Sequence, residues 1–159
     1  MRERLVTDDT GRLVVDVRGP RFGAAITAVV LASALVVQGP VGVGLVVWQW
    51  LAFAISAVAG LAWSPYGWLF RALKRVADLG PPPATETEGP PRFAQACGLI
   101  VATVALVAFA LGAPTIGWIA VAVVLALSAL LATTGICIGC ELYLVGLRAR
   151  QRATPHGGR

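Results

Sequence analysis

The sequence predicts an all-α membrane protein with four transmembrane helices, arranged as two tandem hairpin repeats that are each followed by a short basic interfacial helix. The chain of 159 residues is 57% hydrophobic and 13% charged, whereas a soluble globular chain carries about 25% charged residues. Four apolar runs approach the roughly 20 residues that a helix needs to cross a bilayer. The charged residues lie in the flanks between these runs, as is typical of membrane proteins.

The net charge of +5 does not indicate a nucleic-acid partner, because the basic residues are spread over these flanks. We therefore expect the lipid bilayer, and no nucleic acid, as a partner. Residues 1–21 form a charged lead-in that contains Asp8, Asp9 and Asp16. A cleavable signal peptide has a basic start without such acids, so the first apolar run is expected to stay as a membrane helix.

The first helical hairpin with its interfacial helix is expected over residues 22–79. Its two apolar runs, 22–38 and 41–63, are joined by an uncharged Gly-Pro turn. Ser64-Pro65 then favours a new helix, since Ser is a good N-cap and Pro suits the first helical position. The following segment, 66–77, alternates apolar with basic residues in the pattern of a helix that lies on a membrane surface.

Residues 80–91 form a Pro-rich cytoplasmic linker that is expected to be extended and solvated. The second helical hairpin, with its Cys-x-x-Cys segment, follows over 92–148. Its apolar runs are 93–112 and 115–134. Residues 149–159 are predicted to be a basic cytoplasmic tail.

The basic residues also predict an orientation. All 13 Lys and Arg residues fall in the lead-in, the central linker region or the C-terminal segment, and the two short turns near Gly39 and Gly112 carry none. Because basic loops stay in the cytoplasm, both termini are expected there. The Ala, Val, Gly and Arg bias adds a bacterial origin, so the predicted location is the bacterial cytoplasmic (inner) membrane.

An internal repeat supports the two-hairpin arrangement. The Pro20-Arg21-Phe22 sequence recurs as Pro91-Arg92-Phe93, at an offset of 71 residues. At this offset Ser64 falls on Gly135. Each half has two spans, so the halves would share one orientation, as parallel repeats do.

The Cys137-x-x-Cys140 motif is the main candidate for chemistry. Its spacing is that of dithiol redox sites and of half a zinc site. Zinc needs four ligands, and the chain has no second such motif, so no metal or cofactor is predicted within one chain. Two chains of a homo-oligomer could supply four thiolates. The remaining cysteine, Cys97, lies about one turn inside the third span and is expected to pack as a small apolar residue. The alternative is that it comes within reach of the dithiol after relaxation.

The repeat predicts a helix break near residues 133–135, after which the two cysteines open a new helix. A single helix over 115–148 would be about 50 Å long, well beyond one bilayer core. Unpaired N–H groups at the new helix start would stabilise a thiolate, so Cys137 is the expected nucleophile. The competing possibility is a helix that runs on into the cytoplasm. Glu141 could accept a proton from a thiol or simply face water.

Asp16, Arg18 and Arg21 form a second charged patch at the entry of the first span, expected to be membrane anchors with a local ion pair. No apolar run carries an ionisable residue in its middle, which argues against a proton pump or an ion channel.

The chain resembles the DUF4395 family of small bacterial integral membrane proteins. The matching segments are Val15 to Phe22, Ser64-Pro65 with Phe70-Arg71, Pro91 to Ala94, and Gly135-x-Cys137-x-Gly139-Cys140-Glu141-x-Tyr143. The resemblance implies a membrane protein without an assigned activity. It also implies thiol or sulfur chemistry by association, since members are often encoded near thioredoxin-like or rhodanese-like proteins.

Together these observations predict a cytoplasm-facing dithiol that takes part in thiol redox or sulfur transfer with a soluble thioredoxin-like or rhodanese-like partner. The candidate site residues are Cys137, Cys140 and Glu141. Two alternatives stay open: a transporter component for a small sulfur species, and a structural membrane subunit without chemistry. Whether the chain is an enzyme is left open.

Overall fold

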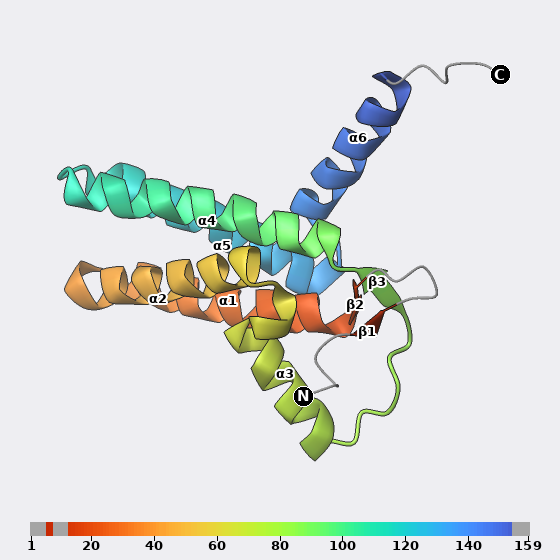
Figure 1. Cartoon of the computed structure of the whole chain (residues 1–159). Helices are drawn as coiled ribbons and strands as arrows, with labels where there is room; N and C mark the ends of the chain where they lie inside the picture. The colour runs from red at the N-terminus through yellow and green to blue at the C-terminus, as the bar shows by residue number, and fades with distance from the viewer. Residues whose placement is uncertain (1–5, 8–12, 154–159) are drawn as a thin grey trace.

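Four long apolar helices run side by side in the computed structural model, which describes residues 6, 7 and 13–153 (Figure 1). They are α1 (Arg18–Val37), α2 (Gly39–Val58), α4 (Gly89–Ala110) and α5 (Pro114–Thr134). Each has 20 to 22 residues and is apolar enough to cross a membrane. The chain is therefore a multi-pass membrane protein, as predicted. Expectations for residues 1–5, 8–12 and 154–159 lie outside the described residues.

Two tight turns join the helices at one end of the bundle. Gln38 and Gly39 both take positive φ angles, 48° and 55°, between α1 and α2. Gly112 does the same at 73° between α4 and α5. Pro40 and Pro114 stand in the first turns that follow, where a helix has no partner for the N–H that proline lacks.

The core lies where the two hairpins cross. α1 packs against α2 and α5, and α4 packs against the same two helices. The buried core consists mainly of alanine and valine with a few larger side chains. Its members are Leu31, Ala34, Val46, Phe53, Ala102, Ala105, Val121 and Val124. Lipid tails are as apolar as the helix surfaces, so there is no hydrophobic driving force between helices in a membrane. Close packing through small residues holds the helices together instead.

A small antiparallel sheet closes the other end of the bundle. Its strands are β1 (Val6–Thr7), β2 (Leu13–Asp16) and β3 (Thr85–Thr87), in that spatial order. β3 differs from the expectation that the whole linker is extended and solvated, because its backbone pairs with β2. Thr85 and Thr87, on either side of Glu86 in β3, suit a strand because they are β-branched.

The first and third spans also begin earlier than the apolar runs indicate. α1 starts at Arg18 rather than Phe22, and α4 starts at Gly89 rather than Phe93. Hydropathy alone misses these first turns because they are polar or rich in proline. Pro90 and Pro91 are nevertheless compatible with a first helical turn.

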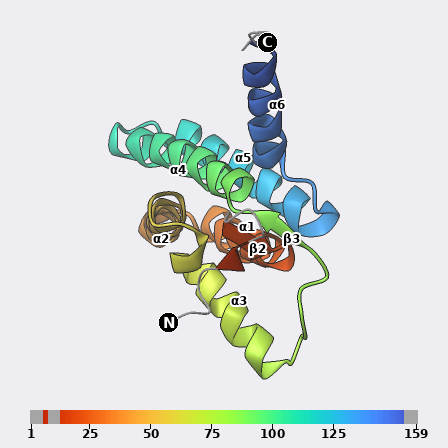
Figure 2. The same ribbon diagram turned by 45° about the vertical axis from the view of Figure 1, so that its right-hand side comes forward.

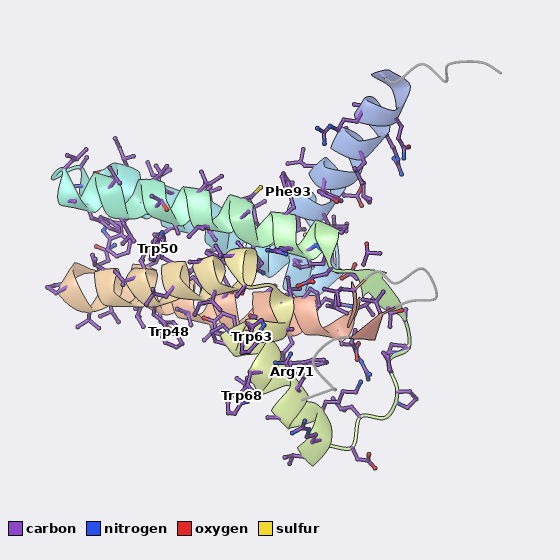
Figure 3. The ribbon with its side chains drawn as sticks, in the orientation of Figure 1. Trp48, Trp50, Trp63, Trp68, Arg71 and Phe93 are labelled. Atoms are coloured by element: carbon purple, nitrogen blue, oxygen red, sulfur yellow. The ribbon has the colours of Figure 1, made fainter. Side chains whose placement is uncertain are left out.

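Two further helices leave the bundle at the sheet end and project in different directions (Figures 1 and 2). α3 (Pro65–Val76) follows α2 through the short 3-10 turn η2 (Leu61–Trp63), and α6 (Ile138–Ala153) follows α5. The exposed Trp63 and Trp68 lie on the side where α3 projects (Figure 3). That these helices lie on the membrane surface stays a prediction.

Two arginines tie the hairpins together crosswise. Arg21 at the start of α1 donates from Nη2 to the carbonyls of Ala132 and Thr133 at the end of α5, at 3.4 and 3.3 Å. Arg92 at the start of α4 donates to the carbonyls of Ala57 and Val58 at the end of α2, both at 2.7 Å. The last carbonyls of a helix lack helical partners, and a cation there also suits the helix dipole.

Other contacts match between the two halves. In the sheet, Val15 lies opposite Glu86, a pair related by the 71-residue offset. Phe22 of α1 packs on Phe70 of α3 with ring centroids 5.6 Å apart, and Phe93 of α4 packs on Tyr143 of α6 at 5.7 Å. The duplication itself stays a prediction.

The contacts of α3 and α6 correspond at an offset of 73 rather than 71 residues. Phe70 thereby matches Tyr143, and Ser64 matches Cys137 instead of Gly135. The second hairpin, 89–134, is five residues longer than the first, 18–58. Its link to the capping residue, 135–137, is three residues shorter than the link 59–64 of the first half, and this leaves a net difference of two.

The closeness of α1 and α2 gives a stability prediction. A Cβ added at Gly42 would lie 2.7 Å from the Ala34 carbonyl oxygen and 3.0 Å from the Trp118 ring, whereas one added at Gly44 meets nothing within 4 Å. Overpacking of this kind costs about 1–3 kcal/mol. Gly42→Ala should therefore lower the unfolding temperature in detergent micelles, while the matched control Gly44→Ala should not. Equal unfolding temperatures for the two variants would contradict this packing.

Candidate functional site

α5 ends immediately before the cysteine motif. Its C-cap is Gly135, whose φ of 79° is left-handed, and α6 begins at Ile138. Glycine takes this conformation without strain, which makes it the usual residue at such a helix end. The predicted break is confirmed, and the alternative of one continuous helix is wrong.

Cys137 occupies the N-cap position of α6. Its carbonyl oxygen accepts the first helical hydrogen bond, from the Glu141 N–H at 3.0 Å. Its Sγ accepts a hydrogen bond from the backbone N–H of Cys140 at 3.3 Å. The motif spacing therefore has a structural meaning, because the side chain of an N-cap bonds the N–H two or three residues into the helix.

Ser64 caps α3 in the same way. The Ser64 carbonyl accepts from the Trp68 N–H at 2.9 Å, and its Oγ accepts from the Gly67 N–H at 3.4 Å. The two projecting helices therefore start alike, and the second carries sulfur where the first carries a hydroxyl. Serine is a common cap, so the thiol at Cys137 adds reactivity to an ordinary structural position.

The start of α6 is fixed against α4. A Cβ at Gly139 would lie 2.8 Å from the Cβ of Ala94, so only glycine allows this approach. Tyr143, one turn later, packs on Phe93, which lies between the two helices (Figure 3), and also against Gly89. These contacts hold the dithiol at the sheet end of the bundle.

The pKa values of the two thiols are shifted in opposite directions. A hydrogen bond from the Cys140 thiol lowers the pKa of Cys137 to about 7; burial opposes this shift and the Cys140 backbone N–H assists it. The same thiol–thiol hydrogen bond raises the pKa of Cys140, and burial raises it further. The thiolate of the pair is therefore favoured on Cys137, and Cys140 keeps its proton. Since the thiolate is the nucleophile, this arrangement distinguishes the roles of the two residues.

A carboxylate that the sequence analysis did not single out acts on both thiols. Glu86 of β3 lies within electrostatic range, and its negative charge raises the pKa of Cys137 and of Cys140. Burial in turn raises the pKa of the Glu86 carboxyl. The side chain is half-buried and forms no hydrogen bond or ion pair with the described residues. The only sequence signal for Glu86 was its position as a single acid between the β-branched residues Thr85 and Thr87.

Glu141, by contrast, is exposed in the first turn of α6. An acid there suits the positive end of the helix dipole, and this gives Glu141 a structural reason to follow the motif. A proton-accepting role for Glu141 stays a prediction. Glu86 is the carboxylate with an electrostatic effect on the two thiols.

A cavity of about 150 Å³ lies on the bundle side of Cys137. Its wall comes from α1, α2, α4, α5 and the start of α6, and most of it is apolar. The polar or sulfur-containing lining residues are Thr27, Gln95, Cys97, Ser128 and Cys137. The structure thus brings Cys97, for which packing was the first expectation and reach of the dithiol the alternative, onto the same cavity as the candidate nucleophile.

The charged patch at the entry of α1 is divided between two roles. Asp16 accepts hydrogen bonds from Arg18 at 3.0 Å and from Lys74 of α3 at 3.1 Å. Burial alone would raise the pKa of Asp16, but these hydrogen bonds lower it overall. Arg21 takes no part in the patch and caps α5 instead. The patch therefore anchors β2 and α3 to each other.

No group of three or more His, Cys, Asp or Glu residues could hold a metal ion within the part of the chain that the structure describes. A family model described as a domain of unknown function, DUF4395, matches residues 15–148. No curated protein and no solved structure matches the chain.

The N-cap geometry predicts a pH profile for alkylation. The rate at Cys137 should rise with pH, because the thiolate fraction rises, and should level off above a midpoint near pH 7. An ordinary cysteine has its midpoint near pH 8.5, which the same peptide in denatured protein should reproduce. The measurement is iodoacetamide labelling in micelles with mass spectrometry of the peptide. A native midpoint equal to the denatured one would contradict the cap.

Glu86→Gln removes a negative charge that disfavours the thiolate. It should therefore lower the alkylation midpoint of Cys137, by up to about one pH unit. The matched control is Glu141→Gln, which removes an exposed acid closer in sequence and should leave the midpoint unchanged. If the control shifts the midpoint and Glu86→Gln does not, the two carboxylates have been assigned the wrong way round.

Proposed function

The chain belongs to the DUF4395 family, and from the geometry of its dithiol we propose that it carries out thiol exchange or sulfur transfer with a soluble partner. One observation carries this proposal: Cys137 caps α6 with its sulfur, and both the N–H and the thiol of Cys140 act on that sulfur. A thiolate at a helix N-terminus beside a protonated second thiol is the arrangement that dithiol exchange needs.

The proposed exchange proceeds in two balanced steps. The Cys137 thiolate attacks one sulfur of a partner disulfide; a bond from Cys137 Sγ to that sulfur forms, and the partner's other sulfur leaves as a thiolate. Cys140 then loses its proton and attacks Cys137 Sγ. This forms the Cys137–Cys140 disulfide and releases the partner with two thiols. The partner disulfide has gained the two electrons that the protein's dithiol has lost.

Glu86 is proposed to take the proton from Cys140 in the second step. A half-buried carboxylate has a raised pKa, which makes it a better base for a weakly acidic thiol. Its carboxylate has no hydrogen bond or ion pair among the described residues, so a proton can be accepted without breaking a salt bridge. After the exchange the proton can pass to solvent or to the released partner thiolate.

The dithiol is proposed to face the cytoplasm of a bacterium. The described basic side chains of the chain belong to the sheet end and its projecting helices, and the turn end has none. Basic loops stay on the cytoplasmic side. A thioredoxin-like or rhodanese-like protein would fit as the partner, because such proteins present the reactive cysteines that this site can engage.

A transporter component for a small sulfur species is the second candidate. The cavity of about 150 Å³ behind Cys137 favours it, because it brings polar groups such as Thr27 and Ser128 into the bundle beside the thiol. Uptake of labelled thiosulfate or sulfide into vesicles separates this candidate from the first. Transport that depends on Cys137 would support it, and vesicles that accumulate no label would exclude it.

Mixed-disulfide trapping tests the first candidate. Cys97→Ser/Cys140→Ser leaves Cys137 as the single cysteine of the chain, so a partner attached to Cys137 should be held covalently and appear as an adduct on a non-reducing gel. Cys97→Ser/Cys137→Ser/Cys140→Ser is the matched control and should give no adduct. Mass spectrometry of the adduct should identify Cys137 as the linked residue. Identical gels for the two variants would contradict the proposed function.

A further inference from the structure

Cys97 is the one thiol that the proposed exchange does not use, yet it lies on the wall of the cavity behind Cys137. It belongs to α4, is half-buried and forms no disulfide. Two cysteines that are 40 residues apart in the chain thus line one small space. The two thiols also lie within electrostatic range of each other.

The packing of α4 on α6 produces this juxtaposition. Ala94 of α4 lies against Gly139 at the start of α6, close enough that a Cβ at 139 would meet the Ala94 Cβ at 2.8 Å. Cys97 is three residues beyond Ala94, so it shares that face of α4. Cys137 stands two residues before Gly139. The same close contact therefore brings both sulfurs to one side of the helix crossing.

The space between the thiols would allow a bond to form. Well-packed interiors contain few voids larger than a water molecule, and this cavity of about 150 Å³ is several times the volume of one water. Cys137 also lies on the link between α5 and α6 and not within either helix. Its side chain can rotate toward the cavity by giving up the hydrogen bond from the Cys140 N–H.

The direction of approach also favours Cys97. A thiolate attacks a disulfide sulfur from the side opposite to the sulfur that leaves, so attacking and leaving groups are roughly in line. A partner bound to Cys137 must come from outside the bundle, which leaves the cavity side free for the attacking thiol. Cys97 is on that side, whereas Cys140 is within α6.

We propose that Cys97 is a third exchanging thiol of this site and resolves disulfides on Cys137 from within the bundle. This proposal rests on the proposed function. When Cys137 is joined to a sulfur of another molecule, Cys97 loses its proton and attacks Cys137 Sγ. The Cys97–Cys137 bond forms as the outer bond breaks, and the departing sulfur leaves as a thiolate that takes up a proton. No further oxidant is required, because the incoming disulfide supplies the oxidising equivalents.

The experiment uses the purified full chain in micelles and an aromatic disulfide whose released thiolate is coloured. The reagent is kept below one equivalent of protein, so each protein molecule reacts at most once. In Cys140→Ser, attack by Cys137 releases one coloured thiolate, and resolution by Cys97 should release a second. In Cys97→Ser/Cys140→Ser the reaction should stop after the first, with the second release slower by roughly tenfold or more.

A matched control moves the thiol by one position along α4. Ala96 precedes Cys97 but does not line the cavity, and a one-residue step turns a helical side chain by about 100°. The variant Ala96→Cys/Cys97→Ala/Cys140→Ser keeps the number of thiols and should release only the first thiolate. Peptide mass spectrometry should find the Cys97–Cys137 linkage in Cys140→Ser alone. Cys97→Ala in place of Cys97→Ser guards against a polar residue disturbing the fold.

Three outcomes separate the two proposals. A second release that needs Cys97, together with the linked peptide, supports the third thiol. One release from Cys140→Ser and from the double variant alike would overturn it and leave the proposed function standing. No rapid first release from Cys137 in any variant would remove the proposed function, and this inference with it.

Discussion

The crosswise capping by Arg21 and Arg92 is the interaction on which the other features of the fold depend. Each arginine begins one hairpin and binds the last carbonyls of the other hairpin's second helix. These carbonyls have no partner within their own helix, and a cation beside them also suits the negative end of the helix dipole. The caps therefore fix where α2 and α5 stop. They also join the two hairpins at the end where the chain turns outward into α3 and α6.

The candidate site follows from the end of α5. Because α5 ends at Gly135, a new helix must begin, and its N-cap needs a side chain that accepts a backbone N–H. The first hairpin meets this need with Ser64 and the second with Cys137. A sulfur in that position gains thiolate character from the helix start. The reactive group of this chain is thus also a structural element, so its geometry is set by the fold and not by a mobile loop.

Hydropathy and turn residues predicted the four spans, because apolar runs of this length between Gly-Pro turns have few other uses. The break before Cys137 was predictable from Gly135 and from the excessive length of a continuous helix. β3 was not predictable from the sequence, since a three-residue strand has no periodicity of its own and this one pairs with β2 some 70 residues away. Glu86 was missed for that reason. Cys97 was expected mainly to pack, with contact to the dithiol as the alternative, because its closeness to Cys137 is set by the packing of α4 on α6 at Gly139.

The measurement that tests the central claim most directly is the chemical state of Cys137 and Cys140 in intact cells. Cells are quenched in acid and alkylated, and the peptide that carries both thiols is analysed by mass spectrometry. An exchanging dithiol should be found in part as a disulfide, a persulfide or a mixed disulfide on Cys137. Two unmodified thiols under all growth conditions would contradict the account. The N-cap sulfur would then have the same structural role as Ser64 and no chemistry.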